Sequence, residues 1–450
     1  MHVETSDKLF SRAARIRRLL RHACFFVFGL IPWLLVNGVF QELAIFAQKS
    51  QKSYGIAAPM ALWIALGNIG PFLHALIADI NGGTVPGWLS AKRTILAVLA
   101  LSTATALGFV FGDIEKQSEK GNDTPLLALC FIGGLGGCLS LVSFYPFVYE
   151  YAQTDNGWST SLMSAGTSVG NLAVVILGIS QQAGLEYGQE PRFSVSTYFW
   201  CVTALCLLSS LAFALVLVLP LTAEERAVSE TSSSLSEYVS FDLWFDEAVS
   251  SDVCRNEADL ESEQQAGVVE RPSFWRSFWH IASHSNYRRF VFVQFWINLL
   301  AMFLPGTAPL AVQRLKGNEN GSILHWMIVS QLLAQTFGII MTGFRTFRCR
   351  ERLLHLTVIA TGLWFAMLGF IVDNKRITTK SRAMPILMVN GGYQLLYGFI
   401  STAVWIAVAE RILPQHKGEH VTRVVGTVNQ IGAFVGALAA YFLTRDGTLQ

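Results

Sequence analysis

The side chains in this sequence that could bind a ligand are amides and aromatic rings placed inside long apolar segments. Carboxamides hydrogen-bond to the edge of a flat solute, and rings stack on its faces. The pattern predicts a polar pocket for a neutral, flat solute rather than for a phosphate or an inorganic ion. Each amide could instead join two helices, a contact worth about 1 kcal/mol or less. The amides are Asn37, Asn68, Asn171, Gln294, Asn298, Gln331, Gln335, Asn390, Gln394, Asn429 and Gln430.

The first apolar segment, residues 22–47, adds a carboxylate to this set. Asn37 lies near its middle and Glu42 lies toward its far end. An ionised carboxylate inside a membrane costs about 3 kcal/mol or more, so we expect Glu42 to face the interior of a helix bundle or a wet cavity. The alternative is that Glu42 lies at the membrane surface and contacts water. Burial disfavours the charged form of a carboxylate. We therefore expect external pH to affect the protein's activity through the ionisation of Glu42.

Patterns for catalysis or metal binding are missing from the sequence. It has no HExxH, GxSxG or GxxxxGK[ST] motif, and no GxGxxG between a strand and a helix. The seven cysteines form neither a CxxC pair nor a Cys/His metal spacing, and we expect no structural disulfide. His74 and His325 have no carboxylate or cysteine at ligand spacing, and we interpret them as wall residues. We expect no enzyme activity, no metal site and no nucleic-acid partner.

Membrane-spanning helices are the elements that must position these side chains. The 450 residues are 52% hydrophobic and only 14% charged, with a mean hydropathy of +0.42, which excludes an ordinary soluble enzyme. A span needs about 20 mostly apolar residues. The sequence predicts an all-α polytopic membrane protein with eleven transmembrane helices, six plus five. They are 22–47, 57–80, 93–112, 125–151, 161–183 and 195–221, then 289–312, 322–344, 353–372, 384–412 and 421–443.

Charge and composition divide the chain into five regions. The positive-inside rule orients them, because 21 of the 33 Lys and Arg residues fall on the side of the N-terminus. Both glycosylation sequons, at Asn122 and Asn320, then fall in outer loops. The regions are a basic cytoplasmic N-terminus at 1–21, an N-terminal bundle at 22–221, a cytoplasmic, Glu-, Asp- and Ser-rich, largely disordered loop at 222–287, a C-terminal bundle at 288–443 and an extracellular C-terminus at 444–450.

Two local features of the spans predict how they bend and pack. Gly70-Pro71 in the second segment removes a backbone hydrogen bond and predicts a kink. Gly166, Gly170 and Gly178 in the fifth segment leave room for another helix backbone to approach closely.

Several of these segments resemble one known family. Residues 33–43 resemble the W-x-x-x-N-G-x-x-x-E-L pattern of the eukaryotic riboflavin transporter family, and residues 65–71 are similar to its A-x-x-N-x-G-P stretch. Residues 144–147 (FYPF) are similar to its F-L-P-F, and 166–170 stand where it has a glycine-rich helix. Residues 430–437 resemble its Q-x-G-S-L-L-G-A. The likeness covers the first 220 residues well, the last 30 or so tolerably and helices seven to ten poorly.

The resemblance implies a major-facilitator-like carrier, close in plan to equilibrative nucleoside transporters, that moves riboflavin inward across the plasma membrane without sodium. Riboflavin is then cargo, so no cofactor is implied, and the two halves would rock around it, by facilitated or weakly proton-linked transport. Amides would pair with the polar edge of the flavin and aromatic rings would stack on it. The expected substrate-binding residues are Trp33, Asn37, Glu42, Asn68, Phe144, Asn298, Tyr393, Tyr397 and Gln430.

Two alternatives remain open at this point. An equilibrative nucleoside carrier would share the plan, and a non-transporting membrane receptor would signal through residues 222–286. The seventh span lacks the family's second Asn-Gly and the outer loops lack the cysteines of animal members, so the resemblance leaves the substrate preference and the outer gate undefined. The sequence does not indicate an oligomeric state.

Overall fold

The chain is all-helical wherever the computed structural model describes it. The described residues are 2–81, 85–152, 158–181, 190–219, 279, 285–313, 320–343, 352–372, 379–412 and 418–445, and no strand occurs among them. The α-helices are α1 His2–Phe28, α2 Leu34–Gln41, α3 Leu43–Lys49, α4 Ala57–Leu66, α5 Ile69–Ile80, α6 Ala91–Phe111, α7 Ile114–Glu119, α8 Thr124–Ala152, α9 Trp158–Gln181, α10 Val195–Val218, α15 Ser285–Gln313, α16 Asn320–Gly343, α17 Leu353–Val372, α18 Thr379–Ile412 and α19 Gly418–Arg445. Two 3₁₀ turns, η1 Ser53–Ile56 and η2 Gly87–Leu89, complete the order.

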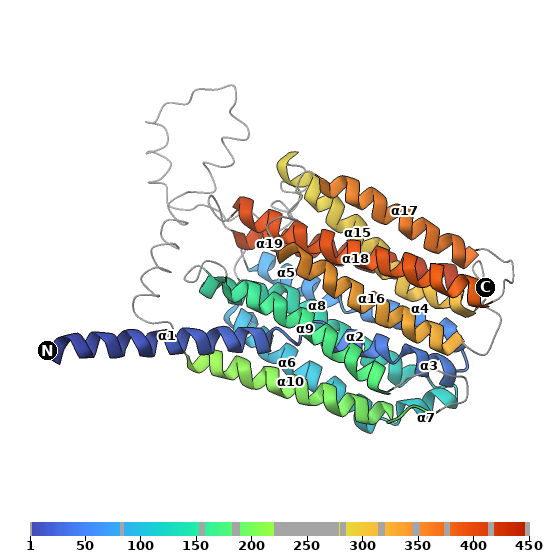
Figure 1. Cartoon of the computed structure of the whole chain (residues 1–450), viewed down its shortest axis with the longest axis horizontal. Helices are drawn as coiled ribbons and strands as arrows, with labels where there is room; N and C mark the ends of the chain where they lie inside the picture. The colour runs from blue at the N-terminus through green and yellow to red at the C-terminus, as the bar shows by residue number, and fades with distance from the viewer. Residues whose placement is uncertain are drawn as a thin grey trace.

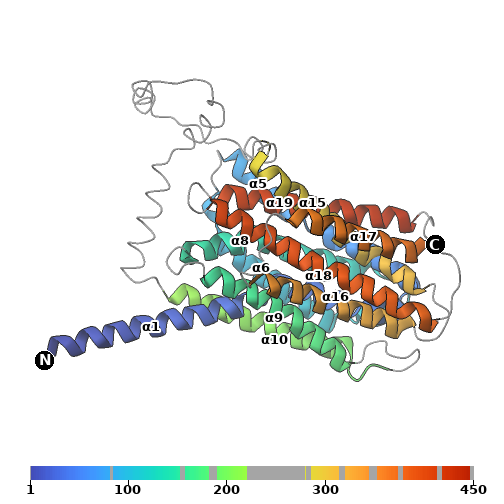
Figure 2. The ribbon, with the colours of Figure 1, turned by 45° about the horizontal axis from the view of Figure 1, so that its top comes forward.

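The helices lie side by side along one long axis (Figure 1). We call α1 to α10 the first half and α15 to α19 the second half. In both views α9 and α10 lie along one side of the bundle and α15 and α17 along the opposite side (Figure 2). The start of α1 projects from one end, here named the N-terminal end, and α19 finishes at the opposite, C-terminal end (Figure 1).

Nine helical segments among the described residues are long and apolar enough to cross a membrane. The two predicted spans outside these nine are residues 22–47 and α18. The first is divided into shorter helices, and the second carries Asn390 and Gln394, whose amides lower its hydropathy. The all-helical, polytopic fold class is therefore confirmed, whereas the number eleven stays a prediction. The predicted loop at 222–287 lies almost entirely outside the described residues.

The first predicted span is broken where we expected one continuous helix. It consists of the end of α1, a turn over residues 29–33, α2, and α3, with Glu42 between the last two. Pro32 explains the first break, because proline has no N–H to donate and its ring clashes with the carbonyl of the residue four positions earlier. The break turns the backbone of residues 29–33 toward neighbouring helices of the first half.

The second predicted span contains the expected kink, slightly before the expected position. α4 ends at Leu66, and α5 begins at Ile69. Pro71 therefore lies in the first turn of α5, where a missing N–H is tolerated. Gly67, at the break, lies so close to α8 that a Cβ there would be 2.3 Å from the carbonyl carbon of Gly134. The kink thus coincides with a backbone-to-backbone contact.

Glycines let α9 pack directly on the backbone of α1. A Cβ at Gly166 would lie 2.0 Å from the carbonyl oxygen of Phe26, and one at Gly170 would lie 2.3 Å from that of Leu30. Such spacing of small residues permits close helix contact in membranes. The close packing predicted for these two glycines is confirmed. Gly178 instead makes room for a side chain, because a Cβ there would lie 2.3 Å from Nε2 of Gln41.

The second half repeats this contact between α19 and α15. A Cβ at Gly432 would lie 2.3 Å from the carbonyl oxygen of Phe295, and one at Gly436 would lie 2.0 Å from that of Leu299. A second close helix contact also occurs in both halves: α8 approaches α4 in the first half, and α18 approaches α16 in the second. The glycines at these contacts are Gly134 in the first half and Gly338 and Gly398 in the second. Each half is therefore joined internally by backbone contacts.

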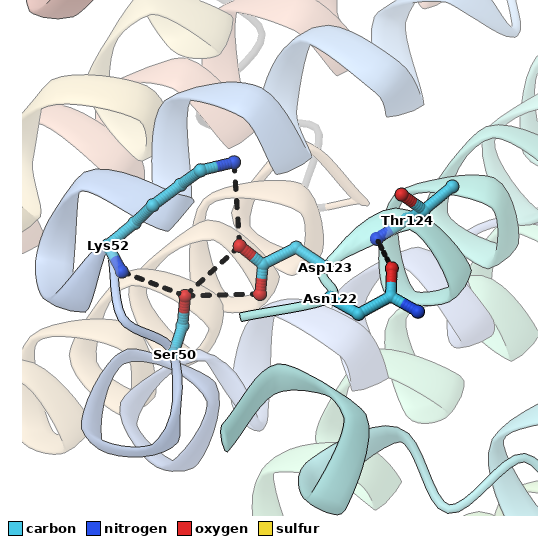
Figure 3. Close-up of polar contacts among 5 residues, drawn as sticks. All are labelled: Ser50, Lys52, Asn122, Asp123 and Thr124. Atoms are coloured by element: carbon cyan, nitrogen blue, oxygen red, sulfur yellow. Dashed lines mark hydrogen bonds and ion pairs between the residues drawn. The ribbon is translucent and has the colours of Figure 1, made fainter. Parts of the chain in front are cut away.

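A polar cluster at the C-terminal end ties the segment after α3 to the start of α8 (Figure 3). Ser50 Oγ donates to both carboxylate oxygens of Asp123, at 3.1 and 3.2 Å, and Lys52 Nζ lies 3.4 Å from Oδ2. The Asp123 side chain is only 4% exposed, so its contacts replace the water it has lost. Asn122 beside it accepts a hydrogen bond from the backbone N–H of Thr124.

We predict opposite effects of two Gly-to-Ala substitutions on stability. Gly436→Ala forces α19 away from α15 and should destabilise the protein by about 1–3 kcal/mol. Gly362→Ala on α17 meets nothing within 4 Å and should stabilise by about 0.5–1 kcal/mol, because alanine loses less conformational entropy. Thermal unfolding of the purified variants measures both changes. Equal melting temperatures for the two variants would contradict the backbone contact between α15 and α19.

Candidate functional site

The two halves pack most closely toward the C-terminal end of the bundle. α4 lies against α15 and α19, and α16 lies against α2, α3 and α9. The other helices of the first two predicted spans pack mainly within the first half. α1 packs against α9 and α10, and α5 packs against α8. The halves are therefore in contact at the C-terminal end of the bundle, which we call the closed end.

A buried polar contact joins the halves at this closed end. Gln41 on α2 and His325 on α16 are both fully buried, and Gln41 Nε2 lies 3.5 Å from His325 Nδ1. The distance is long for a hydrogen bond. Gln41 Oε1 and His325 Nε2 have no hydrogen-bond partner. Buried polar atoms without partners are costly, so this contact is poised to rearrange when the halves separate.

Glu42 follows Gln41 and is also fully buried, with contacts inside the first half. Its Oε2 accepts a hydrogen bond of 3.3 Å from Gln181 Nε2 on α9, while its Oε1 has no partner. We expected a bundle interior or a wet cavity for this carboxylate, with surface water as the alternative; its burial excludes the surface position. Glu115 on α7 is near enough for its charge to act on Glu42. Burial raises the pKa of Glu115 itself.

The other predicted residues of the first half lie at the helix breaks and on α2. Asn37 Nδ2 donates to Asn171 Oδ1 on α9, at 2.6 Å. Trp33 precedes α2 and is partly buried, and Asn68 lies between α4 and α5 with its Oδ1 unpaired. Phe144 is fully buried and stacks on Phe28, with ring centroids 4.3 Å apart. In this conformation Phe144 supports the first half rather than offering a free ring face.

Three of the predicted residues of the second half, Asn298, Tyr393 and Tyr397, make hydrogen bonds where α15 and α18 meet. Tyr397 donates from its hydroxyl to Asn298 Oδ1 at 3.0 Å, and Asn298 Nδ2 donates to the carbonyl oxygen of Gln294 at 2.7 Å. Tyr393 is fully buried and donates to the carbonyl oxygen of Ile297 at 3.2 Å. These bonds fix the side chains, and Tyr397 keeps partial exposure.

A second amide group links α15, α18 and α19. Gln294 Nε2 donates to Asn429 Oδ1 at 2.9 Å and lies 3.2 Å from Ser401 Oγ, while its Oε1 has no partner. Gln430, the next residue on α19, is 4% exposed and its Nε2 has no partner. The structure brings none of Asn37, Asn68 and Gln430 into hydrogen-bond contact with another of the three among the described residues. Their joint role at one solute stays a prediction.

The sequence reasoning did not single out the aromatic contact between the halves. Tyr145 on α8 and Trp405 on α18 lie with ring centroids 6.1 Å apart and planes 7° from parallel. It also missed Gln41 and interpreted His325 only as a wall residue. Periodicity could not identify these residues, because the contacts join segments more than 250 positions apart. The tyrosine within the FYPF segment was the one local signal.

The two sequons lie at the C-terminal end. Asn122 is exposed just before α8, and Asn320 opens α16, although the side chain of Asn320 lies outside the description. Near Asn122, Lys49 pairs with Glu119 at 2.5 Å, a hydrogen bond that raises the pKa of Lys49. Within the described ranges, no group of three or more His, Cys, Asp or Glu side chains is placed to hold a metal ion.

Comparison with protein families and curated proteins gives consistent matches. The model of solute carrier family 52, riboflavin transporter, matches residues 17–446. The chain is similar to riboflavin transporter 2 of Salmo salar, 21% identical over 469 residues that cover 94% of this chain and 95% of that protein. It is 25% identical over 207 residues to human solute carrier family 52, riboflavin transporter, member 2, covering 44% of this chain and 46% of the human protein.

Comparison with solved structures supports the fold. The chain is similar to the nucleoside transporter NupG with a TM-score of 0.51 and 13% identity, covering 94% of this chain and 91% of that one. It is similar to a D-xylose-proton symporter with a TM-score of 0.53 and 11% identity, covering 96% and 89%. At these identities the likeness concerns architecture alone, and it confirms a major-facilitator-like arrangement of the helices.

We predict that a disulfide can join the halves at the closed end without distortion. A Cβ at Gly306 on α15 would lie 3.7 Å from the Cβ of Ala58 on α4, within the range of about 3.5–4.5 Å found in disulfides. Because that Cβ would lie 2.9 Å from the Ala440 Cβ, each variant also carries Ala440→Gly. With a protease site engineered between α10 and α15, Ala58→Cys/Gly306→Cys should stay one band on a non-reducing gel after cleavage.

The matched control is Ala58→Cys/Gly362→Cys, since Gly362 has nothing within 4 Å of its Cβ position. Under the same oxidant this control should separate into two fragments, as should every sample after reduction. Separation of the Ala58→Cys/Gly306→Cys protein without reductant would show that the halves do not meet at this position.

Proposed function

The chain belongs to solute carrier family 52, the riboflavin transporters, and from this premise we propose that it carries riboflavin into cells by alternating access. The observation that carries the proposal is the family match over residues 17–446, which includes both halves of the bundle. The chain is a multi-pass membrane transporter and not an enzyme. Riboflavin is the cargo in this proposal, and no prosthetic group takes part.

The location and orientation are further parts of the proposal. The protein would reside in the plasma membrane with its N-terminus in the cytoplasm, as the Lys and Arg distribution favours. The C-terminal end of the bundle would then face outside, together with both sequons. In that orientation the packing of α4 and α16 across the halves would close the outer side, and cargo would leave this conformation inward.

The chemistry of the polar groups supports a neutral, hydrogen-bonding cargo. Buried amide atoms without partners occur in both halves, at Asn68, Gln294 and Gln430. Such atoms destabilise the protein when neither water nor a ligand contacts them, and they gain hydrogen bonds when a polar solute enters. Uncharged amides also match the polar edge and hydroxyl groups of riboflavin better than they match a phosphate. We keep Trp33, Asn37 and the other expected residues as candidates for contact with the cargo.

Uptake by the purified protein tests the proposal directly. We expect proteoliposomes containing only this protein to accumulate radiolabelled riboflavin in the absence of sodium, with lumiflavin competing and adenosine not competing. An imposed proton gradient should change the rate by a modest factor if transport is weakly proton-linked. Competition by adenosine but not by lumiflavin would favour a nucleoside carrier, and no accumulation of any solute would favour a receptor.

Glu42→Gln should remove most of the dependence of uptake on external pH. The closed outer end buries Glu42 with one oxygen unpaired, which favours the neutral carboxyl. Acidification therefore stabilises the closed outer end, and raising the pH ionises Glu42 and favours opening. Glu115 is the titratable group whose charge acts on Glu42, so Glu115→Gln is the matched control and should retain the pH dependence. Identical pH profiles for wild type and Glu42→Gln would exclude this role.

A further inference from the structure

Tyr145 and Trp405 form an aromatic contact between the halves that the proposed function does not yet use. Their planes are 7° from parallel and their centroids are 6.1 Å apart. Both residues are only partly buried, whereas Phe144 and Phe147, on either side of the Tyr145–Pro146 pair, are fully buried within the first half. The two rings therefore retain accessible surface where the halves meet.

Each ring is held by its own half. The Tyr145 hydroxyl lies 3.4 Å from Ser164 Oγ on α9, which is within hydrogen-bond range. Trp405 packs on α19, where a Cβ at Gly426 would lie 3.6 Å from the indole Cη2. Each residue is seven positions, or about 10 Å along the helix axis, from the end of its own helix, α8 or α18. Relative movement of the halves changes the gap between the rings.

The two rings are nearly parallel, as the two faces of a site for a flat ring must be. Carbon atoms of stacked rings lie about 3.5 Å apart, so two parallel rings that hold a third must be separated by about 7 Å. The plane separation of these rings cannot exceed their centroid separation of 6.1 Å, so no ring fits between them in this conformation. A rocking movement that separates the halves at this point would therefore be needed to admit a flat aromatic system between Tyr145 and Trp405.

Polar groups lie one helical turn deeper on the same helices. Ser401 is four residues before Trp405 on α18, and Asn429 is three residues after Gly426 on α19. Gln294 bonds to Asn429 and lies 3.2 Å from Ser401, with its Oε1 unpartnered and its side chain fully buried. Residues at these spacings share a helix face. An aromatic surface and an amide group therefore lie next to each other along the interface.

We propose that Tyr145 and Trp405 form an aromatic clamp that takes the isoalloxazine ring of riboflavin between the two halves. The amide group of Gln294, Ser401 and Asn429 then meets the polar part of the same molecule. This inference rests on the proposed function and adds the residues that bind the flat ring. A ligand gripped by one ring from each half also couples binding to the approach of the halves.

Flavin fluorescence tests the clamp, because stacking on an indole or a phenol quenches it. Riboflavin is titrated into the purified full-length protein in lipid nanodiscs. Trp405→Leu and Tyr145→Leu should each raise the Kd about tenfold, as expected for loss of one aromatic stacking partner, and reduce the quenching at saturation. Trp200→Leu on α10 is the matched control, because Trp200 is 49% exposed and pairs with Phe111. It should bind and quench as the wild type does.

Binding and uptake together separate the clamp from the proposed transport function. Wild-type affinity and quenching in both leucine variants would show that the rings are only a contact between halves, and the clamp would be wrong while uptake by the wild type stands. Failure of the wild type to bind or accumulate riboflavin would instead remove the proposed function. The two variants lie on different halves, so each gives an independent answer if the other does not fold. Tyr145→Phe and Trp405→Phe retain the rings and should keep the Kd within about threefold of wild type.

Discussion

The contact between glycines and backbone carbonyls is the constraint on which the rest of the structure depends. α9 lies on α1 and α19 lies on α15 with no room for a Cβ, and the contacts of α8 with α4 and of α18 with α16 repeat the pattern. Inside a membrane there is little hydrophobic force between helices, so such close packing provides much of the cohesion. Each half is thereby made internally stiff. Movement between the halves therefore costs less free energy than movement within either half.

That interface is also where polar groups are left incompletely satisfied. Gln41 and His325 meet across it near the C-terminal end, and Tyr145 faces Trp405 nearer the N-terminal end. Within the halves, Glu42 of the first and Gln294 of the second also keep one oxygen each without a partner. A bundle that only had to be stable would replace these groups with apolar ones. Such groups are expected in a carrier whose halves exchange contacts with each other for contacts with a hydrogen-bonding cargo.

Hydropathy predicted most of the fold because long apolar runs leave few alternatives to membrane helices. α6, α8, α9 and α10 begin and end within a few residues of the predicted bounds. The break after Phe28 was missed, since the apolar pattern continues through Pro32. The site was less predictable because depth in a span does not say which neighbour a side chain meets. Thus Asn37 was found paired within the first half, and Phe144 stacked in its core, while the adjacent Tyr145 reaches the second half.

The central claim is that two stiff halves enclose riboflavin at their shared interface. The most direct measurement is an experimental structure of the full-length protein in nanodiscs at saturating riboflavin. The account predicts density for one flavin between the halves, contacted by side chains from both α8 and α18, with the contacts within each half unchanged. Flavin density confined to one half or to the lipid-facing surface, or helices that separate at the glycine contacts, would contradict it.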